Sequence, residues 1–140
     1  MNRKNKAGFT LVELMVVAII VAILAAVAIP LMSGNTKRAM ATEAQAGIGT
    51  IKTAQQVYKA EHGGFYPSSF NCGDDTAQAL KDLTIKAGDL DGKYFGSSSY
   101  QVTSSSSNWS CVATCSNAAQ VGKTVNYDST TMNFTGTLLE

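Results

Sequence analysis

An apolar stretch from Phe9 to Met32 constrains this chain more than any other feature. It follows a basic octapeptide that contains Arg3, Lys4 and Lys6 and no acidic residue. A helix needs about 20 mostly apolar residues to cross a bilayer, so this stretch is long enough to span a membrane. The basic octapeptide predicts that the N-terminus stays on the cytoplasmic side of that membrane.

Glu13 is the charged residue within this stretch, and it lies four residues after the start. A carboxylate inside the bilayer costs about 2.5 to 3.5 kcal/mol on membrane-insertion scales. A segment that served only as an anchor would gain nothing from a carboxylate that makes insertion less favourable. We therefore expect Glu13 to have a partner, and we regard that partner as the best indication of function.

A secretory signal peptide and a plain transmembrane anchor are the two ordinary alternatives. The sequence Ala26-Val27-Ala28 is similar to a signal-peptidase site. However, the apolar stretch is longer than the usual 7 to 15 or so residues of a signal peptide, and it contains Glu13. A plain anchor also leaves Glu13 without a function.

Residues 6–13, Lys-Ala-Gly-Phe-Thr-Leu-Val-Glu, resemble the processing site of type IV prepilins, a family that includes the pseudopilins of type II secretion. Pro30 also matches, because many family members have a helix-bending proline there. The resemblance implies that a peptidase cleaves between Gly8 and Phe9 and methylates the new amine of Phe9. It further implies that Phe9 and Glu13 act in subunit assembly, with Glu13 pairing to the Phe9 amine of a neighbouring subunit.

The resemblance implies a structural subunit of a type IV pilus-like filament, with a type II secretion pseudopilin as the alternative. The precursor would lie in the inner membrane of a bacterium, and the mature subunit would join a helical homo-oligomer at the cell surface. Its partners would be the prepilin peptidase and methylase and the pilus or secretion assembly machinery. Cell adhesion, motility, DNA uptake and protein secretion all stay open as roles, as does a secreted or membrane-anchored binding domain.

Composition and motifs argue against several other functions. Without the leader, eight Lys and Arg residues face ten Asp and Glu residues, so no basic surface for nucleic acid is expected. The chain has one histidine and lacks a Gly-rich phosphate loop and a nucleophile elbow, so we predict no enzyme activity and no cofactor. Asp89-Leu90-Asp91-Gly92 predicts a turn rather than a calcium loop, since the later ligands are missing. We expect no metal site, because the sequence has no closely spaced pair of Cys or His residues that could act as ligands.

The hydrophobic pattern predicts a long helix that changes character along its length. From Phe9 to Ile29 the helix is apolar on every side, and Pro30 predicts a kink because it lacks a backbone donor. Residues 36–61 are amphipathic, and His62-Gly63-Gly64 predicts the helix end with a left-handed glycine. The expected apolar stripe repeats at three- and four-residue steps and consists of Met40, Ala44, Ile48, Ile51, Ala54 or Gln55, and Tyr58.

The rest of the chain predicts a small antiparallel sheet. Residues 65–96 look irregular, except for a short helix over 75–84 that Asp74 or Asp75 would cap. After Gly96 the period becomes two, which predicts three or four strands with loops at 104–107 and 128–130. The residues expected on the buried face are Tyr100, Val102, Trp109, Cys111, Ala113, Cys115, Val125, Tyr127, Met132 and Phe134.

The sheet and the helical stripe each need an apolar cover, so we expect each to bury the other. The predicted fold class is therefore α+β, with a long N-terminal helix packed against a small antiparallel sheet, as in pilins. The expected organisation is a leader over residues 1–8, a hydrophobic helix over 9–35, and a globular head over 36–140.

The chain has three cysteines, Cys72, Cys111 and Cys115. Outside the cytoplasm, this number suggests one disulfide and one remaining thiol. If Cys111 and Cys115 share one strand, about 13 Å separates them, which is too far for a disulfide. We therefore expect a disulfide between Cys72 and either Cys111 or Cys115.

Overall fold

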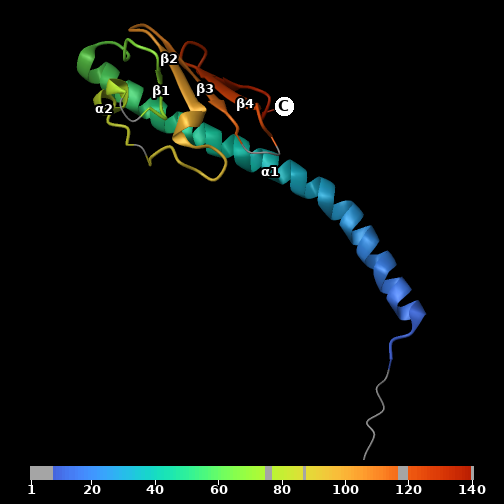
Figure 1. Ribbon diagram of the computed structural model, residues 1–140. Coiled ribbons are helices and arrows are strands. Elements are labelled where there is room, and N and C mark those ends of the chain that lie inside the picture. Colours follow the sequence, from blue (N-terminus) through green and yellow to red (C-terminus); the bar gives the residue numbers. More distant parts are fainter. Residues whose placement is uncertain (1–7, 75–76, 87, 117–119, 140) are drawn as a thin grey trace, which may run out of the picture. The chain divides into compact units, whose positions relative to one another are not determined.

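A helix of 52 residues, α1, runs from Leu11 to His62 (Figure 1). The computed structural model describes residues 8–74, 77–86, 88–116 and 120–139 of the chain. By its contacts the chain divides into two compact units, Met1–Thr36 and Lys37–Glu140. Most of the predicted leader, residues 1–7, lies outside the described residues, so the predicted domain boundaries remain predictions.

The first unit contains the apolar part of α1. By length and composition, this helix includes a segment that could cross a membrane. Its backbone is helical through Pro30, and the kink expected at that residue remains a prediction. Every large hydrophobic side chain from Phe9 to Ile29 is exposed in the single chain. This segment therefore has no cover from its own unit.

The second unit holds a five-stranded antiparallel sheet that lies along the second half of α1 (Figure 1). The order of the strands in the sheet follows their order in the chain, so each strand pairs with the next one in sequence. The strands are β1 (Phe70–Asn71), β2 (Tyr100–Ser104), β3 (Trp109–Thr114), β4 (Thr124–Asp128) and β5 (Asn133–Thr135). The period-two pattern predicted β2, β3 and β4, and it also predicted the segment of β5. The first, β1, lies in the region predicted as irregular, because two residues are too few to show a period.

The core of the second unit forms where the sheet meets the helical stripe. Met40, Ala44, Ile48 and Ile51 are all buried, as predicted. At the ambiguous position of the stripe, Gln55 is fully buried while Ala54 is only partly buried. The Gln55 side chain has partners in this core: its Oε1 accepts from the Tyr66 N–H at 3.0 Å, and its Nε2 donates to Ser104 Oγ at 3.5 Å. The predicted α+β fold is therefore confirmed.

Met132 is a correction to the predicted core. Its side chain is 74 % exposed, whereas Trp109, Val125 and Tyr127 are buried and Phe134 is partly buried. Met132 precedes β5 and lies in the β4–β5 turn, where it adopts a left-handed φ of 54°. Its N–H donates to the Asp128 carbonyl at 2.9 Å. The turn is therefore longer than predicted, and the alternation with Phe134 does not hold.

The short helix α2 spans Gln78–Asp82, inside the range predicted for it. Its N-cap residue is Ala77, which makes no side-chain cap hydrogen bond, so the prediction of Asp74 as the cap was wrong. Instead, the Asp74 carbonyl accepts from the Ala77 N–H at 2.9 Å, so a backbone turn precedes the helix. Asp75, the other predicted cap, lies outside the described residues.

Two helix ends use left-handed residues. Gly63 has a φ of 79° and its N–H donates to the Lys59 carbonyl at 2.9 Å, which confirms the predicted glycine cap of α1. After α2, Thr84 has a φ of 58°, and the Ile85 N–H donates to the Leu80 carbonyl at 2.9 Å. This second pattern is a Schellman motif with a β-branched residue where glycine is preferred.

Candidate functional site

Thr10 and Glu13 form a capping box at the start of α1. Glu13 Oε2 accepts from the Thr10 N–H at 2.9 Å and from the Thr10 hydroxyl at 2.8 Å. In return, Thr10 Oγ1 accepts from the Glu13 N–H at 3.2 Å. These hydrogen bonds satisfy donors that every helix N-terminus leaves free, and the negative charge lies at the positive end of the helix dipole.

This geometry gives Glu13 a partner within its own chain. Sequence reasoning had linked Glu13 to Phe9 and had not considered Thr10. The signal was present, because Thr-Leu-Val-Glu before an apolar run is a Thr-x-x-Glu capping box. All the hydrogen bonds involved are local, so they form within a single chain. The ionic pairing of Glu13 with a Phe9 amine remains a prediction.

Gly8 and Phe9 precede the first turn of α1, and both are exposed. The Phe9 side chain is 83 % exposed, so the bond between Gly8 and Phe9 lies in an open, non-helical segment. Cleavage of this bond would therefore not require a helix to unfold. Cleavage at this bond and methylation of Phe9 remain predictions.

The three cysteines are buried free thiols. The Cys72 N–H donates to the Tyr100 carbonyl at 3.0 Å, while Cys111 stands opposite Val102 on the other side of β2. Strand β2 therefore lies between the backbones of Cys72 and Cys111. Burial raises the pKa of the Cys72 thiol to about 12, and it also raises the pKa of Cys111. Such thiols are almost wholly protonated near neutral pH, which makes them poor nucleophiles. The predicted disulfide of Cys72 with Cys111 or Cys115 remains a prediction.

A second carboxylate of α1, Glu43, holds a loop of the head. Its Oε1 accepts from the Tyr94 N–H at 2.7 Å and from the Phe95 N–H at 2.8 Å. The same loop approaches so closely that a Cβ on Gly92 would lie 2.3 Å from Glu43 Oε1. Glu43 therefore fixes the segment that buries Phe95, and its role is structural.

The segment from Asp89 to Gly92 uses its carboxylates within the fold. Asp89 Oδ2 accepts from the Lys86 N–H at 3.1 Å, and Asp91 Oδ1 accepts from the Ser97 N–H at 2.8 Å. Within the described part of the chain, no group of three or more His, Cys, Asp or Glu residues is arranged to hold a metal ion. Asp89 and Asp91 thus hold the loop by hydrogen bonds to its backbone.

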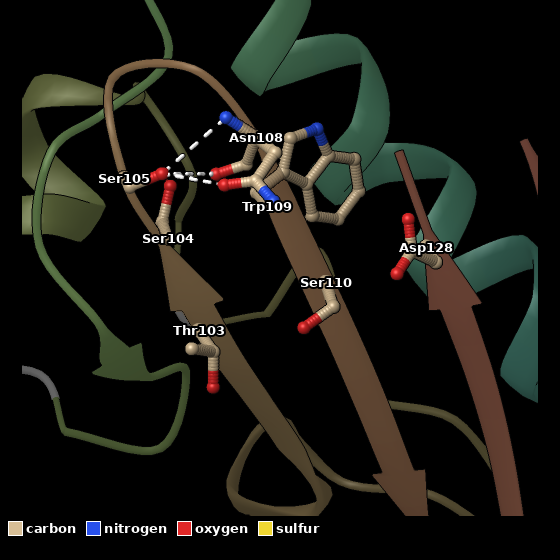
Figure 2. A pocket seen from close by; sticks show the side chains of 7 residues that line it. All are labelled: Thr103, Ser104, Ser105, Asn108, Trp109, Ser110 and Asp128. Carbon is tan, nitrogen blue, oxygen red and sulfur yellow. Dashed lines mark hydrogen bonds between the residues drawn. The ribbon is translucent and has the colours of Figure 1, made fainter. Parts of the chain in front are cut away.

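A small polar hollow lies at the β2–β3 hairpin (Figure 2). Its volume is about 130 Å³, well below the roughly 300 to 1,000 Å³ of typical ligand pockets. Ser105 Oγ donates to Asn108 Oδ1 at 2.6 Å and to the Asn108 carbonyl at 3.1 Å, as the dashed lines in Figure 2 indicate. The polar groups of Ser105 and Asn108 therefore satisfy each other, and the hollow is a feature of the hairpin loop.

Residues 3–29 of the chain match a family model described as the prokaryotic N-terminal methylation motif. This match includes the bond between Gly8 and Phe9, the capping box and most of the apolar segment. It is a match to a motif at the N-terminus, and the rest of the chain lies outside it.

Three relatives illustrate the wider similarity. The chain is 39 % identical over 86 residues to the type II secretion system core protein G of Pseudomonas aeruginosa, covering 61 % of this chain and 55 % of that protein. It is 39 % identical over 87 residues to a fimbrial protein of Neisseria meningitidis, covering 62 % and 51 %. It is 38 % identical over 86 residues to the type IV major pilin protein of Neisseria gonorrhoeae, covering 61 % and 51 %.

The matched part of this chain therefore spans about half the length of these relatives. The relatives are subunits of pili or of a secretion system and not enzymes, in agreement with the prediction that this chain has no enzyme activity. No solved structure matches the chain significantly.

Proposed function

Because this chain belongs to the type IV pilin family, which includes the pseudopilins of type II secretion, we propose that it is a structural subunit of a type IV pilus-like filament. The observation that carries the proposal is the first half of α1. Its large hydrophobic side chains from Phe9 to Ile29 are all exposed in the single chain. Lipid can cover them before assembly, and the equivalent helices of other subunits can cover them afterwards.

The precursor is held in the inner membrane by this helix, with its basic leader on the cytoplasmic side. A prepilin peptidase then cleaves after Gly8, and methylation leaves the Phe9 amine positively charged. The pilus or secretion machinery moves the processed subunit out of the bilayer into a helical homo-oligomer. The apolar helix and the methylation motif support membrane anchoring in this scheme.

Glu13 changes partner during assembly in this proposal. In the free subunit its carboxylate is held by the Thr10 N–H and hydroxyl. In the filament it pairs with the charged Phe9 amine of a neighbouring subunit. An unpaired carboxylate in hydrocarbon is costly, and the amine lowers this cost only at the correct axial offset of the two helices. The pair therefore sets register, while apolar contacts supply most of the adhesion.

Sequencing the mature N-terminus tests the processing step directly. A protein that begins at a methylated Phe9 supports the proposal. A start at Ile29 would instead indicate a secreted domain released by signal peptidase. A start at Met1 would indicate a plain membrane anchor. Electron microscopy of surface fibres, with antibody against the head, then tests whether the processed chain forms filaments.

A type II secretion pseudopilin is the second candidate, and the similarity to core protein G favours it. The two candidates differ in what deletion of the gene removes. A pilus subunit predicts loss of long surface fibres with normal protein secretion. A pseudopilin predicts loss of secreted proteins from the medium in cells that make no long fibres at normal expression.

Pro30 supplies a further expectation for the assembled state. We propose that the helix from about residue 24 to 35 melts in the filament, because Pro30 lacks a backbone donor and Gly34 and Asn35 are weak helix formers. The helical backbone through Pro30 in the free chain leaves this proposal open to test. A filament density map with unbroken helical hydrogen bonding from residue 26 to 35 would contradict it.

A further inference from the structure

The second unit of the molecule begins with two basic residues, Lys37 and Arg38. Residues 14–36, which precede them, contain no charged side chain, and the next acidic residue along the chain is Glu43. The Arg38 side chain is exposed, and the Lys37 side chain is partly exposed. Two positive charges therefore lie together where the chain passes from the apolar segment into the head.

These two charges have no counter-ion within the described part of the chain. No ion pair or side-chain hydrogen bond joins Lys37 or Arg38 to another residue that the structure describes. On a helix, charged side chains pair with residues three or four positions away, and none of those positions is acidic for either residue. Glu43 is directed elsewhere, because its Oε1 accepts from the Tyr94 and Phe95 N–H groups. Both charges are therefore available to a partner outside the chain.

The surroundings of this basic pair favour a partner that is both anionic and apolar. The Thr36 hydroxyl donates to the Met32 carbonyl at 2.9 Å, and the Thr42 hydroxyl donates to the Arg38 carbonyl at 3.0 Å. Both hydroxyls are therefore used within the helix. The Ile29 and Met32 side chains, which come shortly before the pair, are 69 % and 71 % exposed. A phospholipid combines the two properties, because it carries a phosphate next to apolar chains.

The length of the apolar segment brings the pair to the membrane surface. About 20 helical residues cross the hydrocarbon of a bilayer, so a helix that enters it near Leu11, where α1 begins, leaves it near residue 30. Lys37 and Arg38 follow about seven residues later, which is about 10 Å beyond the hydrocarbon. Side chains of a helix tilt toward its N-terminus, and long basic side chains extend back along apolar surface. Both charged ends therefore reach the layer of phospholipid phosphates.

We propose that Lys37 and Arg38 bind the phosphates of anionic phospholipids in the leaflet opposite the leader. The guanidinium of Arg38 can donate two parallel hydrogen bonds to one phosphate, and Lys37 adds a compact positive charge beside it. Each basic residue near an anionic membrane surface strengthens binding about fivefold. The contact holds the start of the head at the membrane before assembly. It rests on the membrane anchoring in the proposed function and is separate from the pairing of Glu13.

The test measures the lipid preference of the full-length chain in vesicles, at a protein-to-lipid ratio low enough to keep the copies apart. Asn35→Cys places an exposed thiol about one turn before Arg38, and the three native cysteines are buried, so a fluorescent label attaches at residue 35. The vesicles are phosphatidylcholine with a nitroxide-labelled quencher lipid that has either a phosphatidylglycerol or a phosphatidylcholine headgroup. We expect half-quenching at an about five- to thirtyfold lower fraction of the anionic quencher. High salt should reduce this preference.

Two double variants separate this contact from general charge attraction. Lys37→Gln with Arg38→Gln removes the pair, so the two quenchers should then act at fractions equal within about twofold. Lys52→Gln with Lys59→Gln is the matched control, because it removes the same charge from later turns of α1, where both ammonium groups lie over aromatic rings of the head. The control should keep the preference for anionic lipid.

Three results would overturn the proposed lipid contact. They are equal quenching by both lipids in the labelled chain, a preference that survives the loss of Lys37 and Arg38, and a preference that the control variant also loses. Absence of quenching by either lipid would overturn the contact as well, and it would also count against membrane anchoring. The measurement needs no fibres, so a preference that depends on this pair in a chain that forms none would support the contact and count against the filament function alone.

Discussion

The two halves of α1 place the same kind of side chain in opposite situations. In the first half, the apolar side chains from Phe9 to Ile29 are exposed on every side. In the second half, a single stripe is apolar, and the head buries it against the sheet. One small domain cannot cover a helix that is apolar on every side, whereas it can cover a single apolar stripe. The first half therefore needs lipid or other copies, and the second needs only its own chain.

Glu13 and Glu43, one from each half of the helix, show the same contrast. Glu13 is held by Thr10, three residues away, and by local hydrogen bonds alone. Glu43 is held by the backbone of Tyr94 and Phe95, which are 51 and 52 residues away. The fold thus fully determines the surroundings of Glu43. The surroundings of Glu13 beyond Thr10 depend on what lies outside the chain.

The largest expected effect on assembly comes from Glu13→Gln. The amide oxygen can still accept from Thr10, and Gln is a normal capping-box residue, so the helix start should be retained. Only the charge is lost, and with it the pairing to a Phe9 amine. We expect normal insertion and cleavage but at least about a tenfold loss of fibres, equivalent to 1.4 kcal/mol or more. Fibre counts by electron microscopy, with N-terminal sequencing as the control, measure both steps.

Glu13→Asp sharpens this prediction. It keeps the charge on a shorter side chain, so fibre numbers should lie between those of the wild type and Glu13→Gln. Normal fibre numbers in Glu13→Gln would show that charge pairing does not specify assembly.

Ile51→Ala tests the buried stripe of the second half. Ile51 is fully buried against the sheet, so truncation should destabilise the head by about 2 to 5 kcal/mol. Thermal or urea unfolding of a head fragment, residues 36–140, measures this change. Val57→Ala is the matched control on the same helix, because Val57 is exposed, and it should change stability by about 0.5 kcal/mol or less. Equal midpoints for Ile51→Ala and the wild type would show that this face is not the core.

Glu43→Ala tests whether the second glutamate is structural. The change leaves the Tyr94 and Phe95 N–H groups without their acceptor, so we expect a loss of about 1 to 3 kcal/mol in the head fragment. Glu61→Ala, at an exposed position near the end of the same helix, should have little effect. If the two variants unfold at the same denaturant concentration, the loop is held by other contacts.

Alanine substitutions at two glycines of the second half should change stability in opposite directions. A Cβ on Gly47 would lie 2.2 Å from Tyr100 Oη, so Gly47→Ala should cost about 1 to 3 kcal/mol unless Tyr100 moves. Gly49 has nothing within 4 Å of an added Cβ, so Gly49→Ala should stabilise the helix by about 0.5 to 1 kcal/mol. Differential scanning calorimetry of the two head fragments should show melting temperatures on opposite sides of the wild type. Shifts of the same sign would contradict the close packing of Gly47 on Tyr100.

Much of this architecture followed from periodicity. The stripe through Ile48 and Ile51 and the alternation around Cys111 could be predicted because each repeats several times at a helix or strand period. Strand β1 could not, because two residues carry no period. The exposure of Met132 was also missed, because the length of the β4–β5 turn decides whether Met132 or only Phe134 falls on the buried face.

Only part of the candidate site could be predicted from the sequence. Gly8, Phe9 and Glu13 were named from the motif and their roles remain predictions, whereas Thr10 was missed although its capping pattern was visible. The hydrogen bonds from Tyr94 and Phe95 to Glu43 had no sequence signal, because the donors are backbone groups far along the chain.

The chain order of the sheet has a consequence for biogenesis. Because every strand pairs with its immediate predecessor, the β-ladders close through short loops, except for the long connection that leads to β2. Short closures cost little loop entropy and favour fast folding. In the proposed scheme, α1 is translated first and anchors in the bilayer, so its apolar stripe is available when the hairpins reach the far side of the membrane. We therefore expect the head to form by docking successive hairpins onto a tethered helix, so that little unfolded β-segment accumulates beside the membrane.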